Sequence, residues 1–380
     1  MIYLDNAATT FPKPNSVYEA MDRANRELAF NAGRGSYKMA RKATQLIDET
    51  KALLLELVGG TGIAKVVFTP SITIALNQIL CGIEFVSGDN IYVSPYEHNA
   101  VARTVHLLEK EKDINVIEMP LKEETLEIDI EQLKYSFVKH PPKCVCCIHV
   151  SNVTGYILPV VEIFEMAKQY NAITILDTAQ SLGLIDVNLS QIYVDFIAFA
   201  GHKTLYGPFG IGGFITTGKV KLKDYIVGGT GSDSLNLDMP EGYPAKYESS
   251  SSNIVAIAGL NAALKEINVE ETFVKEKKLT DYLVSKMKEL DEVILYLPPP
   301  DKHIGIVSFN IEGYKSEDVG MILDEDYDIA VRTGYHCAPL IHAHLNANEY
   351  VGTVRVGMGR CNDTDEIDEF VLDVEDIIQG

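Results

Sequence analysis

The chain has 380 residues, of which 46% are hydrophobic and 23% are charged, and this composition is typical of a globular protein with a large core. Its length favours two or three domains. The net charge of -21 disfavours nucleic acid and anionic membrane surfaces as partners, because both would repel the chain. No apolar run approaches the roughly 20 residues that a membrane span needs.

Two further features of the chain indicate its cellular setting. The N-terminal residues MIYLDNAATTF lack the basic and apolar regions of a secretory signal peptide. The six cysteines are few for this length and show no framework spacing, which favours free thiols. We therefore expect a cytoplasmic protein, since thiols stay reduced there.

The first two thirds of the sequence alternate between short apolar runs and amphipathic stretches. A strand at Ile2–Leu4 is followed by a helix from Asn15, its expected cap, to about residue 30, and by an amphipathic helix at Ala43–Val58. Further strands are expected at Lys65–Phe68, Asn90–Val93, Asn115–Glu118, Cys144–Val150, Ile173–Asp177 and Phe196–Phe199. Further helices are expected at Ile72–Ile83, Ala100–Lys110, Ile130–Phe137 and Val161–Tyr170. Apolar strands between helices predict a mostly parallel sheet covered on both faces, which is an α/β fold.

The pattern changes after a segment rich in Gly, Ser, Asp and Pro, Gly228–Asn253. Helices are then expected at Ile254–Ile267, Glu270–Leu290, Val319–Asp326 and Thr364–Ile378, and strands at Ile304–Ile311 and Val351–Gly357. We expect residues 1–14 to line the active site and pack on a small domain. Residues 15–250 would form the large domain, and residues 251–380 the small α+β C-terminal domain.

Several polar residues follow the expected strands of the large sheet. Asp177 ends a strand, Lys203 follows the next one, and His98 follows an earlier one. Open α/β sheets bind ligands at the carboxyl ends of their strands. A lysine there can form a Schiff base with a carbonyl cofactor, and a histidine can stack on a flat ring. Taken singly, each residue is as well explained by an ordinary structural role.

Glycines follow Lys203 at Gly207, Gly210, Gly212 and Gly213. They make no dinucleotide-binding fingerprint, because no strand, turn and helix with a later acid accompanies them. We interpret them as tight turns.

The segment RTGYHCAP combines Cys337 with a flanking His336 and with Arg332 five positions earlier. An electropositive loop of this kind favours the nucleophilic thiolate. Two alternatives are an inert buried cysteine and a metal site that includes His342 and His344, although no established ligand spacing supports the latter. In KCVCCIHV, strand alternation places Cys144 and Cys146 on one face and Cys147 on the other, and core packing explains them better than metal binding.

Together and in this order, these motifs resemble the class V aminotransferase-like, fold-type I pyridoxal-phosphate (PLP) enzymes, and within them the cysteine desulfurases. The resemblance runs nearly end to end, through YLDNAATT, FTPSITIALN, EHNA, HVSNVTG, LDTAQS and GHK. RTGYHCAP is similar to the catalytic-cysteine segment of the SufS-like and selenocysteine-lyase-like group. The resemblance implies PLP as cofactor, L-cysteine or L-selenocysteine as substrate, and no bound metal.

The resemblance assigns a role to each matching residue. Lys203 would bind the cofactor as a Schiff base, Asp177 would pair with the ring nitrogen, and His98 would stack on the ring. Gln180 and Asn152 would lie near the ring hydroxyl, while Thr73 and His202 would hold the phosphate. Arg355, together with Asn152, would bind the substrate carboxylate, for which a guanidinium fork is suited. Cys337 would attack the substrate sulfur.

The sequence departs from the family pattern at three positions near the expected phosphate site. Ala200 stands where a serine is usual, Ile74 where a glutamate is usual, and ESSSSN with Ser251 replaces a segment whose threonine reaches the phosphate of the other subunit in related dimers. Ser251 keeps a hydroxyl for that role. These departures bear on cofactor affinity more than on the reaction type.

The mechanism implied is that L-cysteine displaces Lys203 from PLP and the freed amine removes the α-proton. Cys337 then takes the sulfur as a persulfide, alanine leaves with His98 as proton carrier, and the sulfur passes to an acceptor protein or thiol, as in iron–sulfur cluster assembly. A homodimer is expected from the cross-subunit segment. Alternatives are selenocysteine lyase, another class V reaction such as transamination, and an inactive partner of a sulfur-transfer complex.

Overall fold

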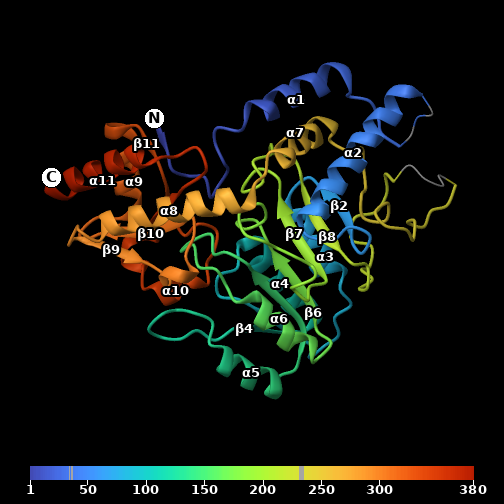
Figure 1. Cartoon of the computed structure of the whole chain (residues 1–380). Helices are drawn as coiled ribbons and strands as arrows, with labels where there is room; N and C mark the ends of the chain where they lie inside the picture. The colour runs from blue at the N-terminus through green and yellow to red at the C-terminus, as the bar shows by residue number, and fades with distance from the viewer. Residues whose placement is uncertain (34, 36, 231–234) are drawn as a thin grey trace.

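The protein is described by a computed structural model that covers residues 1–33, 35, 37–230 and 235–380 (Figure 1). A seven-stranded sheet in the order β2-β8-β7-β6-β5-β3-β4 forms its centre. The strands of this sheet are β2 (Lys65–Thr69), β3 (Asn90–Val93), β4 (Asn115–Glu118), β5 (Pro142–Ile148), β6 (Ile173–Asp177), β7 (Phe196–Ala200) and β8 (Gly212–Thr216). The pairings among β3, β4, β5, β6 and β7 are parallel, which confirms the predicted α/β fold.

Helices cover both faces of this sheet because its strands are apolar on both sides. One face packs on α2 (Lys38–Leu57), α5 (Ile130–Lys139), α6 (Val160–Lys168) and α7 (Ile254–Lys265). The other face packs on α3 (Ile72–Gly82) and α4 (Asn99–Lys112). The cysteines of β5 follow this division, since Cys144 and Cys146 join one core and Cys147 the other, as the alternation predicted.

Strand β8 is the element of the large sheet that the sequence did not indicate. It pairs antiparallel with both β2 and β7, so two of the glycines interpreted as turns lie in a central strand. A Cβ atom at Gly213 would approach the Val67 carbonyl oxygen to 2.1 Å, so the glycine is required for close pairing. The interpretation of Gly212 and Gly213 as turn residues was therefore wrong, whereas Gly207 and Gly210 do lie in the loop before β8.

A second, antiparallel sheet has the order β12-β13-β10-β9 and lies to the left in Figure 1. Its strands are β9 (Val293–Tyr296), β10 (Ile306–Ile311), β12 (Arg332–Gly334) and β13 (Thr353–Gly357). It packs on α8 (Val269–Met287), α9 (Ser316–Tyr327) and α11 (Thr364–Gln379), and α10 (Ile341–Leu345) follows β12 along the chain. Two short 3-10 helices span Pro300–Lys302 and Asn348–Tyr350.

The two ends of the chain lie beside this smaller sheet. Strand β1 (Ile2–Tyr3) pairs in parallel with β11 (Ile329–Ala330), which holds the N-terminal segment against the small-sheet core. Helix α7 packs instead on α1 (Asn15–Glu27) and α2, and its apolar side chains belong to the core of the large sheet. The division of the chain into domains at residue 250 stays a prediction.

Helix starts differ from those expected in two places. Pro14, with no side-chain hydrogen bond, is the cap of α1, so Asn15 is the first helical residue and does not cap the helix as predicted. Helix α2 begins at Lys38, before the predicted start at Ala43. Its first turn buries only Ala40, so the apolar periodicity that predicts a helix is weak there. Among the described residues, no helix is long and apolar enough to cross a membrane.

Candidate functional site

The predicted site residues of the large sheet follow neighbouring strands. His98 comes after β3, Asn152 after β5, Asp177 ends β6 and Lys203 follows β7. These four strands are consecutive neighbours in the sheet, and their parallel direction brings the four residues to one edge. The structure therefore groups residues that lie up to 105 positions apart in the sequence, at the edge where open α/β sheets bind ligands.

Asp177 is buried at the end of β6, with 2% of its surface exposed. Its Oδ1 accepts a hydrogen bond from the Ala179 N–H at 2.8 Å. Burial raises the pKa of this carboxyl, while the hydrogen bond and the charge of Lys203 oppose the rise. A cationic partner would stabilise the ionised form, and a protonated ring nitrogen is such a partner.

Lys203 is partly buried, and burial lowers the pKa of its amine to about 8. The charge of Asp177 opposes this shift, and the guanidinium groups of Arg355 and Arg332 add to it. A lysine with such a pKa is neutral in an appreciable fraction near pH 7. The neutral amine is the form that attacks a carbonyl.

His98 is the cap of α4, and its Nδ1 accepts a hydrogen bond from the Ala100 N–H at 3.0 Å. Burial lowers its pKa to about 4, with further contributions from Lys203 and Arg332. The ring is therefore neutral at neutral pH. Because Nδ1 is an acceptor, the hydrogen of the neutral ring lies on Nε2.

Two of the predicted cofactor ligands carry buried polar atoms without a hydrogen-bond partner in the described structure. They are Oδ1 of Asn152 and Nδ1 of His202. The His202 ring stacks on Phe209 with 4.6 Å between ring centroids, and burial lowers its pKa to about 3. Gln180 donates from Nε2 to the Ala7 carbonyl at 2.8 Å. Orphaned polar atoms beside an amine and a buried carboxyl fit a ligand that brings its own phosphate and hydroxyl groups.

Thr73 and Ser251 have exposed side chains. Thr73 lies in the first turn of α3, where the capping residue is Ser71, whose Oγ accepts from the Ile74 N–H at 3.4 Å. Ser251 lines a cavity of about 240 Å³ beside the turn that precedes α3. Within the described chain, neither hydroxyl has a hydrogen-bond partner, so both are available to a ligand.

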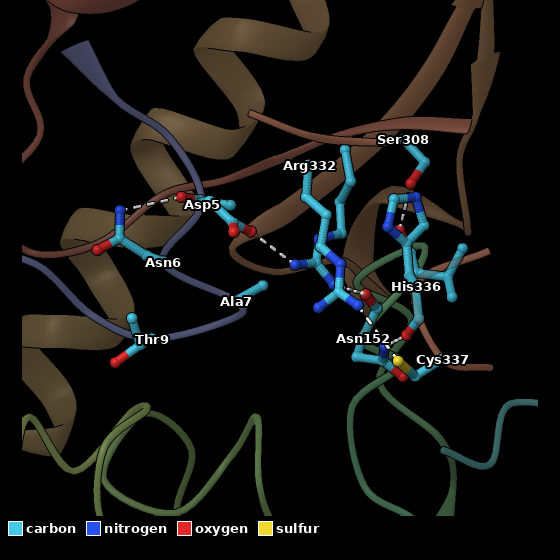
Figure 2. A network of polar contacts seen from close by, with 12 residues as sticks. Asp5, Asn6, Ala7, Thr9, Asn152, Ser308, Arg332, His336 and Cys337 are labelled. Atoms are coloured by element: carbon cyan, nitrogen blue, oxygen red, sulfur yellow. Dashed lines mark hydrogen bonds and ion pairs between the residues drawn. The ribbon is translucent and has the colours of Figure 1, made fainter. Parts of the chain in front are cut away.

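Cys337 lies after β12, partly buried and with a positive φ of 57°. Arg332 donates a hydrogen bond from Nη2 to its sulfur at 3.2 Å, and the Asn99 N–H donates to its carbonyl at 2.6 Å. Figure 2 shows Arg332 and Cys337 on the same side of the site as Asn152. The cation beside the thiol that the sequence predicted is therefore Arg332.

His336 does not contribute to that positive environment, and this part of the prediction was wrong. Its ring is 2% exposed and points away from the sulfur in Figure 2, with Nε2 bonded to Oγ1 of Thr353 at 2.9 Å. Burial lowers the pKa of His336 well below its usual value, so the ring is uncharged. Among the described residues, no group of three or more His, Cys, Asp or Glu side chains could hold a metal ion.

Arg355 is buried in β13, with 1% of its surface exposed. Its Nη2 donates to Oδ1 of Asp5 at 2.7 Å, and its Nη1 donates to the Asn152 carbonyl at 2.9 Å. Its Nε has no partner in the described structure. Figure 2 shows Asp5 approaching from the N-terminal segment. Since a guanidinium carries five N–H donors, Arg355 retains hydrogens for a carboxylate ligand.

Three residues of this region were not singled out by the sequence. Asp5 pairs with Arg355 across 350 positions. Glu97 is fully buried and accepts from the Ile148 N–H at 2.7 Å, which ties the His98 loop to the end of β5. Lys13 donates to the His202 carbonyl at 2.7 Å, and burial lowers its pKa to about 7. Of these three residues, only Asp5 and Glu97 could have been found from the sequence, because they stand inside the motifs YLDNAATT and EHNA.

Comparison with known proteins identifies the family. The model of the family described as aminotransferase class-V matches residues 2–370. A probable cysteine desulfurase of Methanothermobacter thermautotrophicus is 32% identical over 96% of this chain and 92% of its own length. A probable cysteine desulfurase of Pyrococcus abyssi is 32% identical over 100% of this chain and 95% of its own length.

A solved structure gives the same result. The apo structure of a cysteine desulfurase from Thermococcus onnurineus NA1 superposes with a TM-score of 0.91 at 31% identity, covering 100% of this chain and 95% of that chain. The chain therefore belongs to the class-V aminotransferase family of PLP-dependent enzymes, and within that family to the cysteine desulfurases.

Proposed function

We propose that the protein is a PLP-dependent enzyme that converts L-cysteine to L-alanine and carries the sulfur as a persulfide on Cys337. One observation carries this proposal: the Cys337 carbonyl accepts a hydrogen bond from the Asn99 N–H at 2.6 Å, which fastens the cysteine beside the His98 loop, and Arg332 donates to the Cys337 sulfur at 3.2 Å. This contact brings the Cys337 segment to the same edge of the large sheet as Lys203. The names of the relatives support the same reaction.

The residues present fit the cofactor. Lys203 supplies the amine, Asp177 the carboxyl for the ring nitrogen, and His202 and Thr73 the phosphate donors. When bound, PLP supplies an electron sink for the carbon from which a proton is removed. Gln180 and Asn152 would contact the ring hydroxyl, for which the unpaired Oδ1 of Asn152 is available.

Arg355 and Asn152 would bind the carboxylate of the amino acid. The side chain of Arg355 is already held by Asp5 and by the Asn152 carbonyl, so its direction is fixed before substrate arrives. A pre-oriented guanidinium loses less entropy on binding. Its unpaired Nε and the second hydrogen on each Nη remain for the substrate.

Lys203 and His98 would move the protons. The Lys203 amine, once free, removes the α-proton of the substrate, because its lowered pKa makes the neutral base available near pH 7. His98 is neutral and presents a hydrogen on Nε2, so it can pass a proton to the product carbon.

Cys337 would carry out the sulfur transfer. Its thiolate attacks the substrate sulfur, the bond between that sulfur and the β-carbon breaks, and the S–S bond of the persulfide forms. The electron pair of the broken bond stays with carbon, which is protonated to give alanine. Arg332 donates to the Cys337 sulfur at 3.2 Å and orients it for the attack.

We further propose a cytoplasmic homodimer, in which Ser251 reaches the phosphate site of the other subunit, and a protein or thiol acceptor for the persulfide sulfur, as in iron–sulfur cluster assembly. The exposed hydroxyl of Ser251, which has no hydrogen-bond partner among the described residues, supports the dimer. Sedimentation at working concentration would show a dimer. A monomer with full activity and bound PLP would contradict it.

The experiment that tests the function is incubation of the PLP-loaded protein with L-cysteine and a reductant, with alanine and sulfide measured together. Equal amounts of both are expected. Lys203→Ala should lose the visible absorbance of bound PLP and all turnover. Persistence of covalently fixed PLP after borohydride treatment of Lys203→Ala would show that another lysine binds the cofactor.

A further inference from the structure

Tyr206, three residues after Lys203, has an unusual backbone conformation. Its φ is +56°, a left-handed value that bulky residues rarely adopt, and its side chain is 3% exposed. The Tyr206 N–H donates to the Lys203 carbonyl at 2.7 Å, and the Gly207 N–H donates to the Gly201 carbonyl at 2.7 Å. These two bonds close the loop that carries Lys203. A strained residue persists where its surroundings hold it in place.

The first of those surroundings is the chain segment after β13. The Arg360 N–H donates to the Tyr206 hydroxyl at 2.6 Å, and the Arg360 guanidinium lies 4.2 Å from the centre of the Tyr206 ring. Residue 359 is a glycine, and a Cβ atom there would come within 2.8 Å of the Tyr206 hydroxyl. The phenol is therefore enclosed by a segment that continues directly from the strand of Arg355.

The second is Glu276 in α8, which is 5% exposed and lies close enough to the Tyr206 phenol for each group to shift the pKa of the other. Burial raises the pKa of Glu276 to about 8, while Tyr206, Lys275 and Arg360 oppose the rise, so the acid is mostly neutral near pH 7. A phenol has one hydrogen to donate. Since the Tyr206 hydroxyl accepts from the Arg360 N–H, its own hydrogen remains available to the nearby Glu276 carboxyl.

The position of Glu276 links this arrangement to the site. Glu276 lines a cavity of about 20 Å³ that Gln180 and Thr204 also line. Thr204 is the residue after Lys203, and Gln180 is a proposed cofactor ligand. The loop of Lys203 is thus fixed by its own backbone turn and by two segments that pack with the small sheet. These segments are helix α8 and the chain after β13.

We propose that Tyr206 is a positioning residue, held by Arg360 and Glu276, that fixes the Lys203 loop relative to the strand carrying Arg355. The consequence for cysteine turnover rests on the proposed function; the consequence for the loop itself does not. Tyr206 touches no reacting atom in this scheme. It sets the distance between the amine of Lys203 and the guanidinium that would hold the substrate.

The test uses Tyr206→Phe, which keeps the ring and removes only the hydroxyl, and Glu276→Gln, which keeps an acceptor oxygen. Hydrogen exchange of the full-length protein without cofactor is followed in the peptide spanning 201–207. Exchange there should be about tenfold faster in Tyr206→Phe, the factor expected for one lost buried hydrogen bond, and close to wild type in Glu276→Gln. The peptide spanning 306–311 in β10 should be unchanged.

In the PLP-loaded protein, Tyr206→Phe should lower kcat for L-cysteine about tenfold with KM little changed, because the carboxylate ligands are intact. If Tyr206→Phe does not fold, Glu276→Leu, which removes the carboxyl beside the Tyr206 hydroxyl, should also accelerate exchange at 201–207. Unchanged exchange at 201–207, or equal acceleration in every peptide, would overturn the positioning role. Faster loop exchange in a protein that neither binds PLP nor forms alanine would instead reject the proposed function and retain the positioning of Lys203.

Discussion

The contact between Arg332 and Cys337 gives the most direct prediction about the chemistry. Replacing Arg332 with methionine keeps much of the side-chain volume and removes the cation that lies 3.2 Å from the sulfur. The uncharged His336, whose ring is bonded to Thr353, cannot replace it. We therefore expect the Cys337 sulfur to be a weaker nucleophile in Arg332→Met.

The size of the effect follows from the type of bond. A hydrogen bond to a charged group contributes about 1.5–3 kcal/mol. Because about 1.36 kcal/mol corresponds to a factor of ten, sulfur transfer to Cys337 should slow by about 10- to 150-fold. Arg332→Lys should lose less, since it keeps the charge although it loses the planar fork.

The assay is the rate of alkylation of Cys337 by iodoacetamide at a fixed pH, quantified by mass spectrometry in protein without cofactor. The exposed Cys361 in the same molecule serves as the reference thiol. Its alkylation should not respond to Arg332→Met. Single-turnover persulfide formation with L-cysteine then measures the transfer step.

Two results would refute the reasoning. One is a Cys337 alkylation rate in Arg332→Met that matches wild type, which would show that the guanidinium does not affect the sulfur in solution. The other is a His336→Gln protein whose Cys337 alkylation rate changes as much as that of Arg332→Met. That outcome would show that His336 affects the reactivity of the Cys337 sulfur as much as Arg332 does.

Three further predictions concern the substrate, the sulfur carrier and the cofactor lysine. Arg355→Ala should weaken L-cysteine binding by about 100-fold or more and leave PLP binding intact, because it removes a charged partner of the carboxylate; unchanged KM would assign the carboxylate to another residue. Cys337→Ala should keep PLP but release little sulfide, and wild type treated with cysteine should gain one sulfur on the Cys337 peptide; sulfur on the Cys361 peptide would contradict this. The rate at which protein without cofactor captures PLP should rise with pH and level off above about 8, because burial lowers the Lys203 pKa from 10.5 to about 8 and only the neutral amine reacts; a rate that rises until pH 10 would show an unshifted lysine.

The alternation of apolar runs and amphipathic segments was sufficient to predict the parallel strands of the large sheet and the helices between them. Strands such as β7 are apolar throughout because both of their faces are covered, so their signal is local. Strand β8 was not predicted because its glycines, required by the close approach of β2, resemble turn residues in a sequence. Strand β9 was not predicted because all its residues are only partly buried, so no alternation between a buried and an exposed face marks it.

The site likewise has one part that the sequence predicted and another that only the tertiary structure decided. The motifs in the sequence identified which residues to expect there, since Asp177, Lys203 and His98 each follow a strand, and parallel strands end at a common edge. The sequence could not decide which side chain lies beside Cys337, because the ring of the adjacent His336 turns toward Thr353 while Arg332 reaches back to the sulfur.

The pairing of Asp5 with Arg355 and the enclosure of Tyr206 by Arg360 and Glu276 likewise depend on how distant segments pack. Local spacing specifies an element and the residues at its end. The direction of a side chain and the burial that shifts its pKa arise only when segments hundreds of residues apart exclude water together.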